Sequence, residues 1–150
     1  MGQEGVRRCQ EGGTAYAAWD GADGNYSRMP TVDEVRLEDD TRYLHITSNE
    51  TIGGIRMPDF PDFGVRVIAD MSSDYLSRPI PWAQFDVVYG GAQKNLGPAG
   101  LAVVFARKSL VEEAPDNQPA YLRYKTHAEA DSMANTPPVF SIWATGLMLN

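Results

Sequence analysis

The sequence predicts an α/β fold in which a mostly parallel sheet is flanked by helices. Two apolar runs, 65–69 and 87–89, are rich in residues that favour β-strands. The segment between them is long enough for one crossover connection, which would make the two strands parallel. Their carboxyl ends would then meet at one edge of the sheet, where open α/β sheets bind ligands.

Other elements are predicted on both sides of this pair. Thr31 and Glu34 have the spacing of a capping box and predict a short helix that ends near residues 37–40. The prolines at 137 and 138 suit the first turn of a helix over 139–149. Further predictions are strands at 43–47 and 101–106, a short helix over 107–114 and an irregular loop over 116–131.

The composition limits the class of protein. The 150 residues are 43% apolar, enough for a hydrophobic core, and 13 Lys and Arg against 20 Asp and Glu give a net charge of −7. Such an acidic chain without a basic cluster argues against a nucleic-acid partner. Since no apolar run approaches the roughly 20 residues of a membrane span, we predict no membrane association.

The cysteine and histidine content bears on metals and on location. Cys9 is the single cysteine, so no internal disulfide can form, and we predict a cytoplasmic protein. One cysteine and two histidines are too few for a zinc site, which takes about four ligands. We therefore predict no metal.

A lysine and a carboxylate follow the two central strands. Lys94 lies in a turn rich in glycine, and Asp70 ends the apolar run before it. The ordinary explanations are a plain loop for Lys94 and a helix N-cap or a solvated carboxylate for Asp70. Pyridoxal 5'-phosphate, however, requires such a pair: the lysine binds the cofactor covalently, and the carboxylate pairs with the protonated pyridine nitrogen.

Four sequence runs, in order, resemble the phosphoserine aminotransferase family, which belongs to class V of the fold-type I pyridoxal phosphate enzymes. The runs are NETI at 49–52, DMSS at 70–73 with SRPI at 77–80, GAQKNLGPAGL at 91–101, and NTPP at 135–138. The resemblance covers roughly residue 42 to the end and is thinner before it. It implies part of the large domain of a fold-type I enzyme.

The resemblance also assigns site residues. It implies that Lys94 and Asp70 are catalytic and that six residues bind the cofactor: Thr51, Asp70, Gln93, Lys94, Asn135 and Thr136. The Thr51 hydroxyl would contact the ring oxygen, and Gln93 would contact the phosphate of its own subunit. The pair Asn135–Thr136 would reach the cofactor phosphate of the other subunit in a homodimer. From the residues alone, Thr51 is also an ordinary turn residue and Thr136 an ordinary helix cap.

The activity implied by the family is amino transfer between glutamate and 3-phosphohydroxypyruvate, which yields phosphoserine, in serine biosynthesis. The same family acts on 4-phosphohydroxy-threonine in pyridoxine biosynthesis. Two alternatives remain open: another class V aminotransferase, and a non-catalytic or inactive truncated fragment.

Complete members of the family are longer than this chain. We therefore expect residues 1–150 to form the central portion of one cofactor-binding large domain, with the small C-terminal domain absent. Residues 1–28 are polar and rich in glycine, and we expect them to be poorly ordered.

Overall fold

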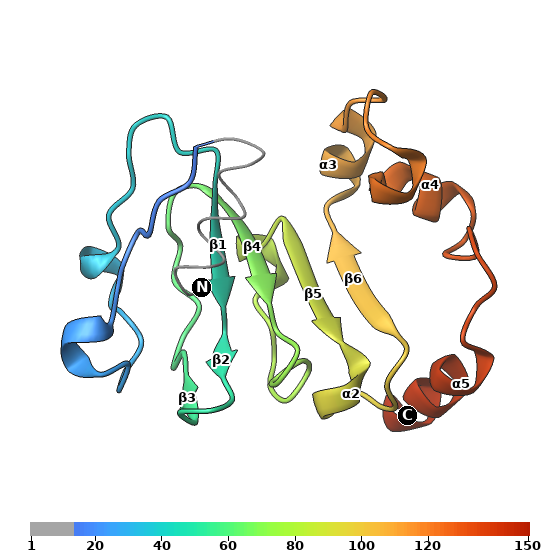
Figure 1. Ribbon diagram of the computed structural model, residues 1–150, viewed down its shortest axis with the longest axis horizontal. Helices are drawn as coiled ribbons and strands as arrows, with labels where there is room; N and C mark the ends of the chain where they lie inside the picture. The colour runs from blue at the N-terminus through green and yellow to red at the C-terminus, as the bar shows by residue number, and fades with distance from the viewer. Residues whose placement is uncertain (1–13) are drawn as a thin grey trace.

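A four-stranded sheet forms the centre of the molecule in the computed structural model, which describes residues 14–150 (Figure 1). The strand order is β1-β4-β5-β6; β1 and β5 each pair with β4 in parallel, and β6 pairs with β5 antiparallel. Strands β2 and β3 form a separate antiparallel pair. The predicted α/β class with a mostly parallel sheet is therefore confirmed.

The strands are β1 (Tyr43–Thr47), β2 (Asn49–Glu50), β3 (Ile55–Arg56), β4 (Arg66–Asp70), β5 (Val87–Gly91) and β6 (Ala102–Ala106). The α-helices are α2 (Ala92–Asn95), α3 (Lys108–Glu113), α4 (Tyr124–Glu129) and α5 (Val139–Met148). Single turns of 3-10 helix are η1 (Ala22–Gly24), η2 (Val32–Glu34), η3 (Trp82–Gln84) and η4 (Ala120–Leu122).

The central strands end at one edge of the sheet. In the register of the parallel pairs, Thr47 of β1 lies beside Asp70 of β4, which lies beside Tyr89 of β5. Figure 1 shows these carboxyl ends at the lower edge, together with the β2–β3 hairpin and α2. The edge predicted to carry the chemistry is therefore built from β1, β4 and β5.

The hydrophobic core lies on one face of the sheet and extends to this edge. Its buried members are Met57, Phe60, Val67, Ala69, Met71, Tyr75, Phe85, Val88, Ala92 and Leu96. Because side chains alternate along a strand, Val67 and Ala69 enter the core while Asp70 points to the opposite face. Beyond the strands, the Met71 N–H donates to the Tyr89 carbonyl at 2.8 Å, which keeps the ends of β4 and β5 together.

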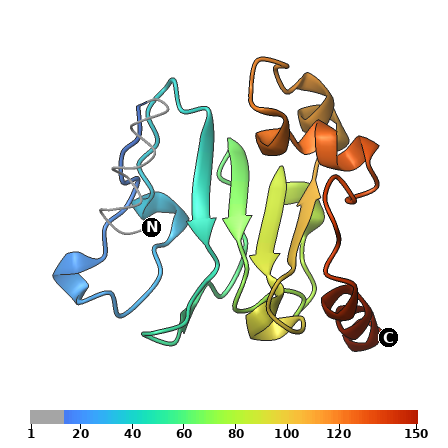
Figure 2. The same ribbon diagram turned by 45° about the vertical axis from the view of Figure 1, so that its right-hand side comes forward.

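Helices α3 and α4 lie at one end of β6, and α5 lies at the other, near α2 (Figures 1 and 2). The connection between α5 and the turn after α2 is direct, because the Ser141 hydroxyl donates to the Ala99 carbonyl at 2.9 Å. No helix within residues 14–150 is long and apolar enough to cross a membrane.

Three local predictions differ from the structure. The irregular loop predicted over 116–131 is wrong, because η4 and α4 lie there and place His127 in a helix. The capping box of Thr31 and Glu34 is confirmed, but it begins only the 3-10 turn η2, since Val35 is already extended. The β2–β3 hairpin was not predicted: Thr51 is in a turn, as one interpretation had it, but Asn49–Glu50 and Ile55–Arg56 on either side of that turn pair as strands.

The prediction of poor order for residues 1–28 falls partly outside the described residues, which begin at 14. From there on, the chain is joined to residues 34–41 by several contacts. The Tyr16 hydroxyl accepts the Glu38 N–H at 2.8 Å, and Arg28 donates two hydrogen bonds to Glu34 at 2.6 and 2.7 Å. These bonds from Arg28 lower the pKa of Glu34 to about 2.

Candidate active site

Lys94 lies at the carboxyl edge of the sheet, in the short helix α2 that directly follows β5. Its Nζ donates a hydrogen bond to Thr51 Oγ1 at 2.7 Å. Thr51 belongs to the turn between β2 and β3, so the contact joins residues 43 positions apart. Both side chains are exposed, and a ligand can therefore reach the amine and the hydroxyl from solvent.

Asp70, the last residue of β4, is half-buried and has one carboxylate oxygen in use. Its Oδ1 accepts the Ser72 N–H at 2.9 Å and the Ser72 hydroxyl at 2.6 Å. Among residues 14–150 no hydrogen bond to Oδ2 is formed. The helix-cap alternative does not apply, because residues 71–81 form turns rather than a helix.

Gln93 lies beside Lys94 in α2, and its amide folds back over Gly91. A Cβ atom on Gly91 would stand 2.4 Å from Gln93 Oε1 and 2.9 Å from Nε2, so the amide would have to move if Gly91 carried a side chain. Thr51, Asp70, Gln93 and Lys94 therefore lie on elements that meet at one edge of the sheet.

Asn135 and Thr136 lie elsewhere, in the exposed segment that precedes α5. Asn135 Nδ2 contacts the Thr136 carbonyl at 3.4 Å. No hydrogen bond in the described part of the chain joins either residue to the other four predicted site residues. Their role toward a second subunit stays a prediction.

The serines after Asp70 tie the three site elements together. The sequence suggests that they help the turn and support Asp70, but it does not indicate their bonds to Gly91 and Asn49. The Ser72 hydroxyl accepts the Gly91 N–H at 3.1 Å while it donates to Asp70. The Ser73 hydroxyl donates to the Asn49 carbonyl at 2.8 Å and accepts from Asn49 Nδ2 at 2.8 Å. The feature of the sequence that indicates such a role is the pair of serines that follows shortly after the carboxylate at the end of β4.

A histidine–tyrosine pair lies on the same face of the sheet as Asp70. His45 Nε2 and the Tyr89 hydroxyl are 2.9 Å apart. In β1, His45 lies two residues before Thr47, which pairs with Asp70, so the side chains of His45 and Asp70 point to the same face of the sheet. Burial lowers the pKa of His45, because desolvation disfavours the charged ring, although the charge of Asp70 acts in the opposite direction. From the sequence, a histidine in this strand is expected to be packed or bonded to the backbone, and the bond to the Tyr89 side chain is not anticipated.

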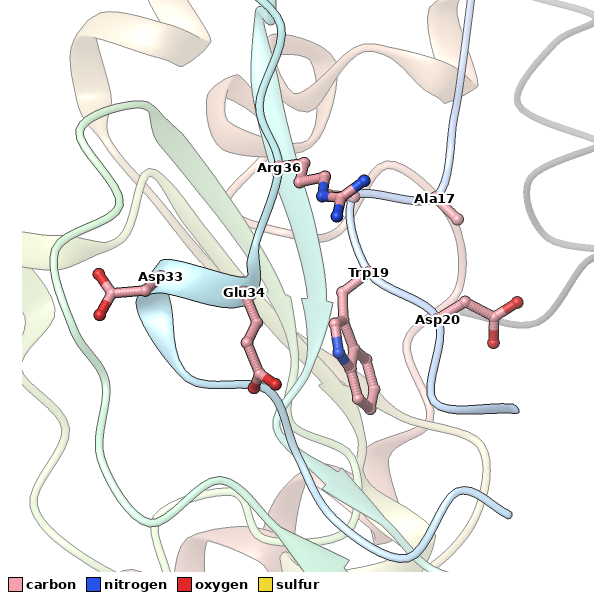
Figure 3. Close-up of a pocket in the computed structure, with 7 residues that line it drawn as sticks. Ala17, Trp19, Asp20, Asp33, Glu34 and Arg36 are labelled. Atoms are coloured by element: carbon pink, nitrogen blue, oxygen red, sulfur yellow. The ribbon is translucent and has the colours of Figure 1, made fainter. Parts of the chain in front are cut away.

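The hollow shown in Figure 3 is separate from this site. It has a volume of about 470 Å³ and is lined by Ala17, Ala18, Trp19, Asp20, Asp33, Glu34 and Arg36. Its three carboxylates and one guanidinium give this hollow a net negative charge, which does not suit an anionic cofactor. The described residues also contain no cluster of three or more His, Cys, Asp or Glu that could hold a metal ion.

The groups at the carboxyl edge fit pyridoxal phosphate. The amine of Lys94 is accessible, and one oxygen of Asp70 is free to pair with a cationic ring nitrogen. Thr51 and Gln93 add a hydroxyl and an amide as hydrogen-bonding groups at the same edge. The fold and these residues together define a protein of the class of pyridoxal phosphate enzymes that have an open, mostly parallel sheet.

Comparison with known proteins places the chain within that class. The family model for class-V aminotransferases matches residues 18–150. The chain belongs to the class-V aminotransferase family. This agrees with the resemblance given by the four sequence runs.

The similar proteins are phosphoserine aminotransferases. The Bacillus subtilis enzyme is 49% identical over 138 residues, which are 92% of this chain and 38% of the relative. The solved structure of the Bacillus circulans enzyme has a TM-score of 0.91 and 46% identity, and the match covers 96% of this chain and 40% of that one. A phosphoserine aminotransferase from Trichomonas vaginalis, solved with PLP bound, has a TM-score of 0.82 and 33% identity over 95% of this chain and 43% of its own. This chain thus spans about two-fifths of the length of its relatives.

Proposed function

We propose that this chain forms the cofactor-binding part of a pyridoxal phosphate-dependent phosphoserine aminotransferase. Such an enzyme transfers an amino group from glutamate to 3-phosphohydroxypyruvate and yields phosphoserine and 2-oxoglutarate. The supporting observation is that Lys94, bonded to Thr51, and Asp70, with one free oxygen, lie at the same edge of the sheet. Relatives that carry this activity in their names are 41–49% identical.

The residues of the chain have distinct tasks in this reaction. Bound pyridoxal phosphate supplies an acceptor for the electron pair left at the substrate α-carbon. The Lys94 amine would take the proton from that carbon as general base and return it as general acid. Asp70 Oδ2 would keep a proton on the pyridine nitrogen, since an adjacent carboxylate favours the charged form of a base. Thr51 and Gln93 would orient the cofactor.

A homodimer supplies the remaining cofactor contacts in this proposal. Asn135 and Thr136 are exposed and bind no other predicted site residue in their own chain, which suits a role toward a partner subunit. Helix α5 begins three residues later and exposes large apolar side chains, with Phe140 67% and Trp143 59% accessible. An interface over this helix would remove that surface from water. We place the protein in the cytoplasm.

The length of the chain bears on which part of the enzyme it represents. Since the chain spans about 40% of its relatives, we propose that it corresponds to the central portion of one large domain. The small C-terminal domain of the relatives, and further residues that contact substrate, would then lie outside the matched part of those relatives. Activity on 4-phosphohydroxy-threonine is a second reaction of the same proposed site.

A coupled assay tests the proposed activity. The chain would be incubated with pyridoxal phosphate, phosphoserine and 2-oxoglutarate, and the glutamate formed would be detected with glutamate dehydrogenase. We expect glutamate from phosphoserine, none from serine or alanine, and none with Lys94→Ala. Turnover of alanine instead would indicate another class V activity. The absence of turnover would favour the non-catalytic alternative.

A further inference from the structure

The Ser72 side chain has two hydrogen-bond partners from different parts of the site. Its hydroxyl donates to Asp70 Oδ1 at 2.6 Å and accepts the Gly91 N–H at 3.1 Å. Gly91 is the last residue of β5 and the N-cap of α2, the helix that carries Lys94. One hydroxyl therefore links the carboxylate to the start of the lysine helix.

Close packing makes this link possible. A Cβ atom on Gly90 would lie 3.1 Å from the Ser72 Cα, 3.2 Å from the Ser72 nitrogen and 2.9 Å from Tyr75 Cδ1. Any side chain at Gly90 would thus push the turn after β4 away from β5. Glycine at this position brings the Ser72 hydroxyl within reach of the Gly91 N–H.

The two donors from Ser72 make the oxygens of Asp70 unequal. A carboxylate without partners can exchange its two oxygens by rotation about its terminal torsion, which is broad. Here the backbone N–H and the hydroxyl of Ser72 both bind Oδ1, and hydrogen bonds to a charged acceptor are the strong ones. Oδ2 is left as the oxygen that can pair with a ligand.

We propose that Ser72 is a positioning residue that fixes Asp70 Oδ2 toward the pyridine nitrogen and couples that carboxylate to the lysine helix through Gly91. This inference rests on the proposed function, because it assigns a role toward the same cofactor. In this role the Ser72 hydroxyl acts through its bonds to Asp70 and Gly91.

The test compares two ligands that differ at the ring nitrogen. Dissociation constants for pyridoxal phosphate and for its analogue with carbon in place of that nitrogen would be measured by absorption and fluorescence. In the parent chain we expect pyridoxal phosphate to bind more tightly, because the analogue has no charge for Asp70 to pair with. Ser72→Ala should weaken pyridoxal phosphate binding about tenfold and change analogue binding less than about twofold.

Ser73→Ala is the matched control, since Ser73 is the neighbouring serine, is also half-buried, and bonds Asn49 rather than Asp70. The ratio of the two affinities should be unchanged in this variant. Equal losses for both ligands in Ser72→Ala, or no loss for either, would overturn the positioning role. If the parent chain binds neither ligand, the proposed function itself fails, and the inference fails with it.

A second measurement needs no cofactor. Amide hydrogen exchange, followed by NMR, should be faster at Gly91 in Ser72→Ala than in the parent, because that N–H loses its acceptor. In Ser73→Ala it should be unchanged. An unchanged rate at Gly91 in both variants would show that the hydroxyl bridge does not exist in solution and would overturn the proposal.

Discussion

Two regions carry residues predicted to bind the same cofactor: the carboxyl edge of β4 and β5, and the segment before α5. They differ in how far these residues are already held in place by other parts of the chain. At the edge, Lys94 and Thr51 are already in contact at 2.7 Å, and Asp70 is oriented by Ser72. Before α5, Asn135 and Thr136 are exposed and contact only each other among the hydrogen bonds described for their side chains.

This difference has a structural cause. Parallel strand pairing brings the ends of β1, β4 and β5 to one place without any partner. Beyond Asn135 and Thr136, the Ser141 hydroxyl of α5 donates to the Ala99 carbonyl in the turn after α2. The first region can therefore form within one chain, whereas in the proposed dimer the second would act only at the surface of a partner subunit.

Replacing the lysine should have the largest effect. We expect Lys94→Ala to abolish transamination, because no other described group at this edge offers an exposed amine. Since the side chain is exposed, the free energy of unfolding should change by less than about 0.5 kcal/mol. Steady-state assays and thermal unfolding on the same samples check both parts. Turnover at the parental rate would remove Lys94 from the mechanism.

Removing the charge of Asp70 should have the next largest effect. Asp70→Asn retains the size of the side chain but cannot stabilise a proton on the pyridine nitrogen, so we expect turnover to fall roughly 10²- to 10³-fold. Cofactor affinity should fall as well. The kinetic constants at saturating cofactor separate the two effects, and unchanged kinetics would show that Asp70 only shapes the turn.

The segment before α5 can be tested by complementation between two impaired variants. The double variant Asn135→Ala/Thr136→Ala should weaken cofactor binding about tenfold, because hydrogen bonds to a charged phosphate are lost. Mixed with Lys94→Ala, it should regain activity: each hybrid dimer has one site with an intact lysine and an intact partner segment. Random mixing would restore about a quarter of the parental activity. If the mixture is no more active than its components, the pair does not act across subunits.

A pair of glycine substitutions compares the packing of the two regions. Gly90→Ala should destabilise the chain by about 1–3 kcal/mol, since its Cβ would meet Tyr75 and the Ser72 backbone. Gly146→Ala, in α5, has nothing within 4 Å of its Cβ and should stabilise the helix by about 0.5–1 kcal/mol. Chemical denaturation measures both. Equal effects at the two positions would contradict the close packing at the site edge.

The structural features that could be predicted from the sequence are those that depend on local residue pattern. The runs ending at Asp70 and Tyr89 have strand composition, and their crossover spacing predicts that Asp70 and Lys94 share an edge. Side-chain partners between elements were not predictable, because the Lys94–Thr51 and His45–Tyr89 bonds depend on strand register. The helix at 124–129 was missed because its sequence is polar and its apolar periodicity is weak. The proposed role of Asn135 and Thr136 would depend on the surface of a partner subunit, which a single chain does not show.

The smallest effect concerns pH. Burial lowers the pKa of His45 below its ordinary value of 6.5, so the unfolded chain takes up the proton before the folded chain does. The unfolded state then binds more protons, and stability should decrease as pH falls through 6.5 toward the lowered folded-state pKa. His45→Gln should lose less stability over this interval than the parent chain. Urea denaturation at pH 7.5 and 5.5 checks this, and parallel losses in both chains would contradict it.

The most direct test of the central claim is a visible absorption titration of this chain with pyridoxal phosphate, beside Lys94→Ala. The claim is that the edge formed by β4, β5 and α2 makes a cofactor site from residues of one chain. It predicts a visible band, shifted from that of the free cofactor, that saturates with the parent chain and is missing with Lys94→Ala. Identical spectra for the two chains would contradict it.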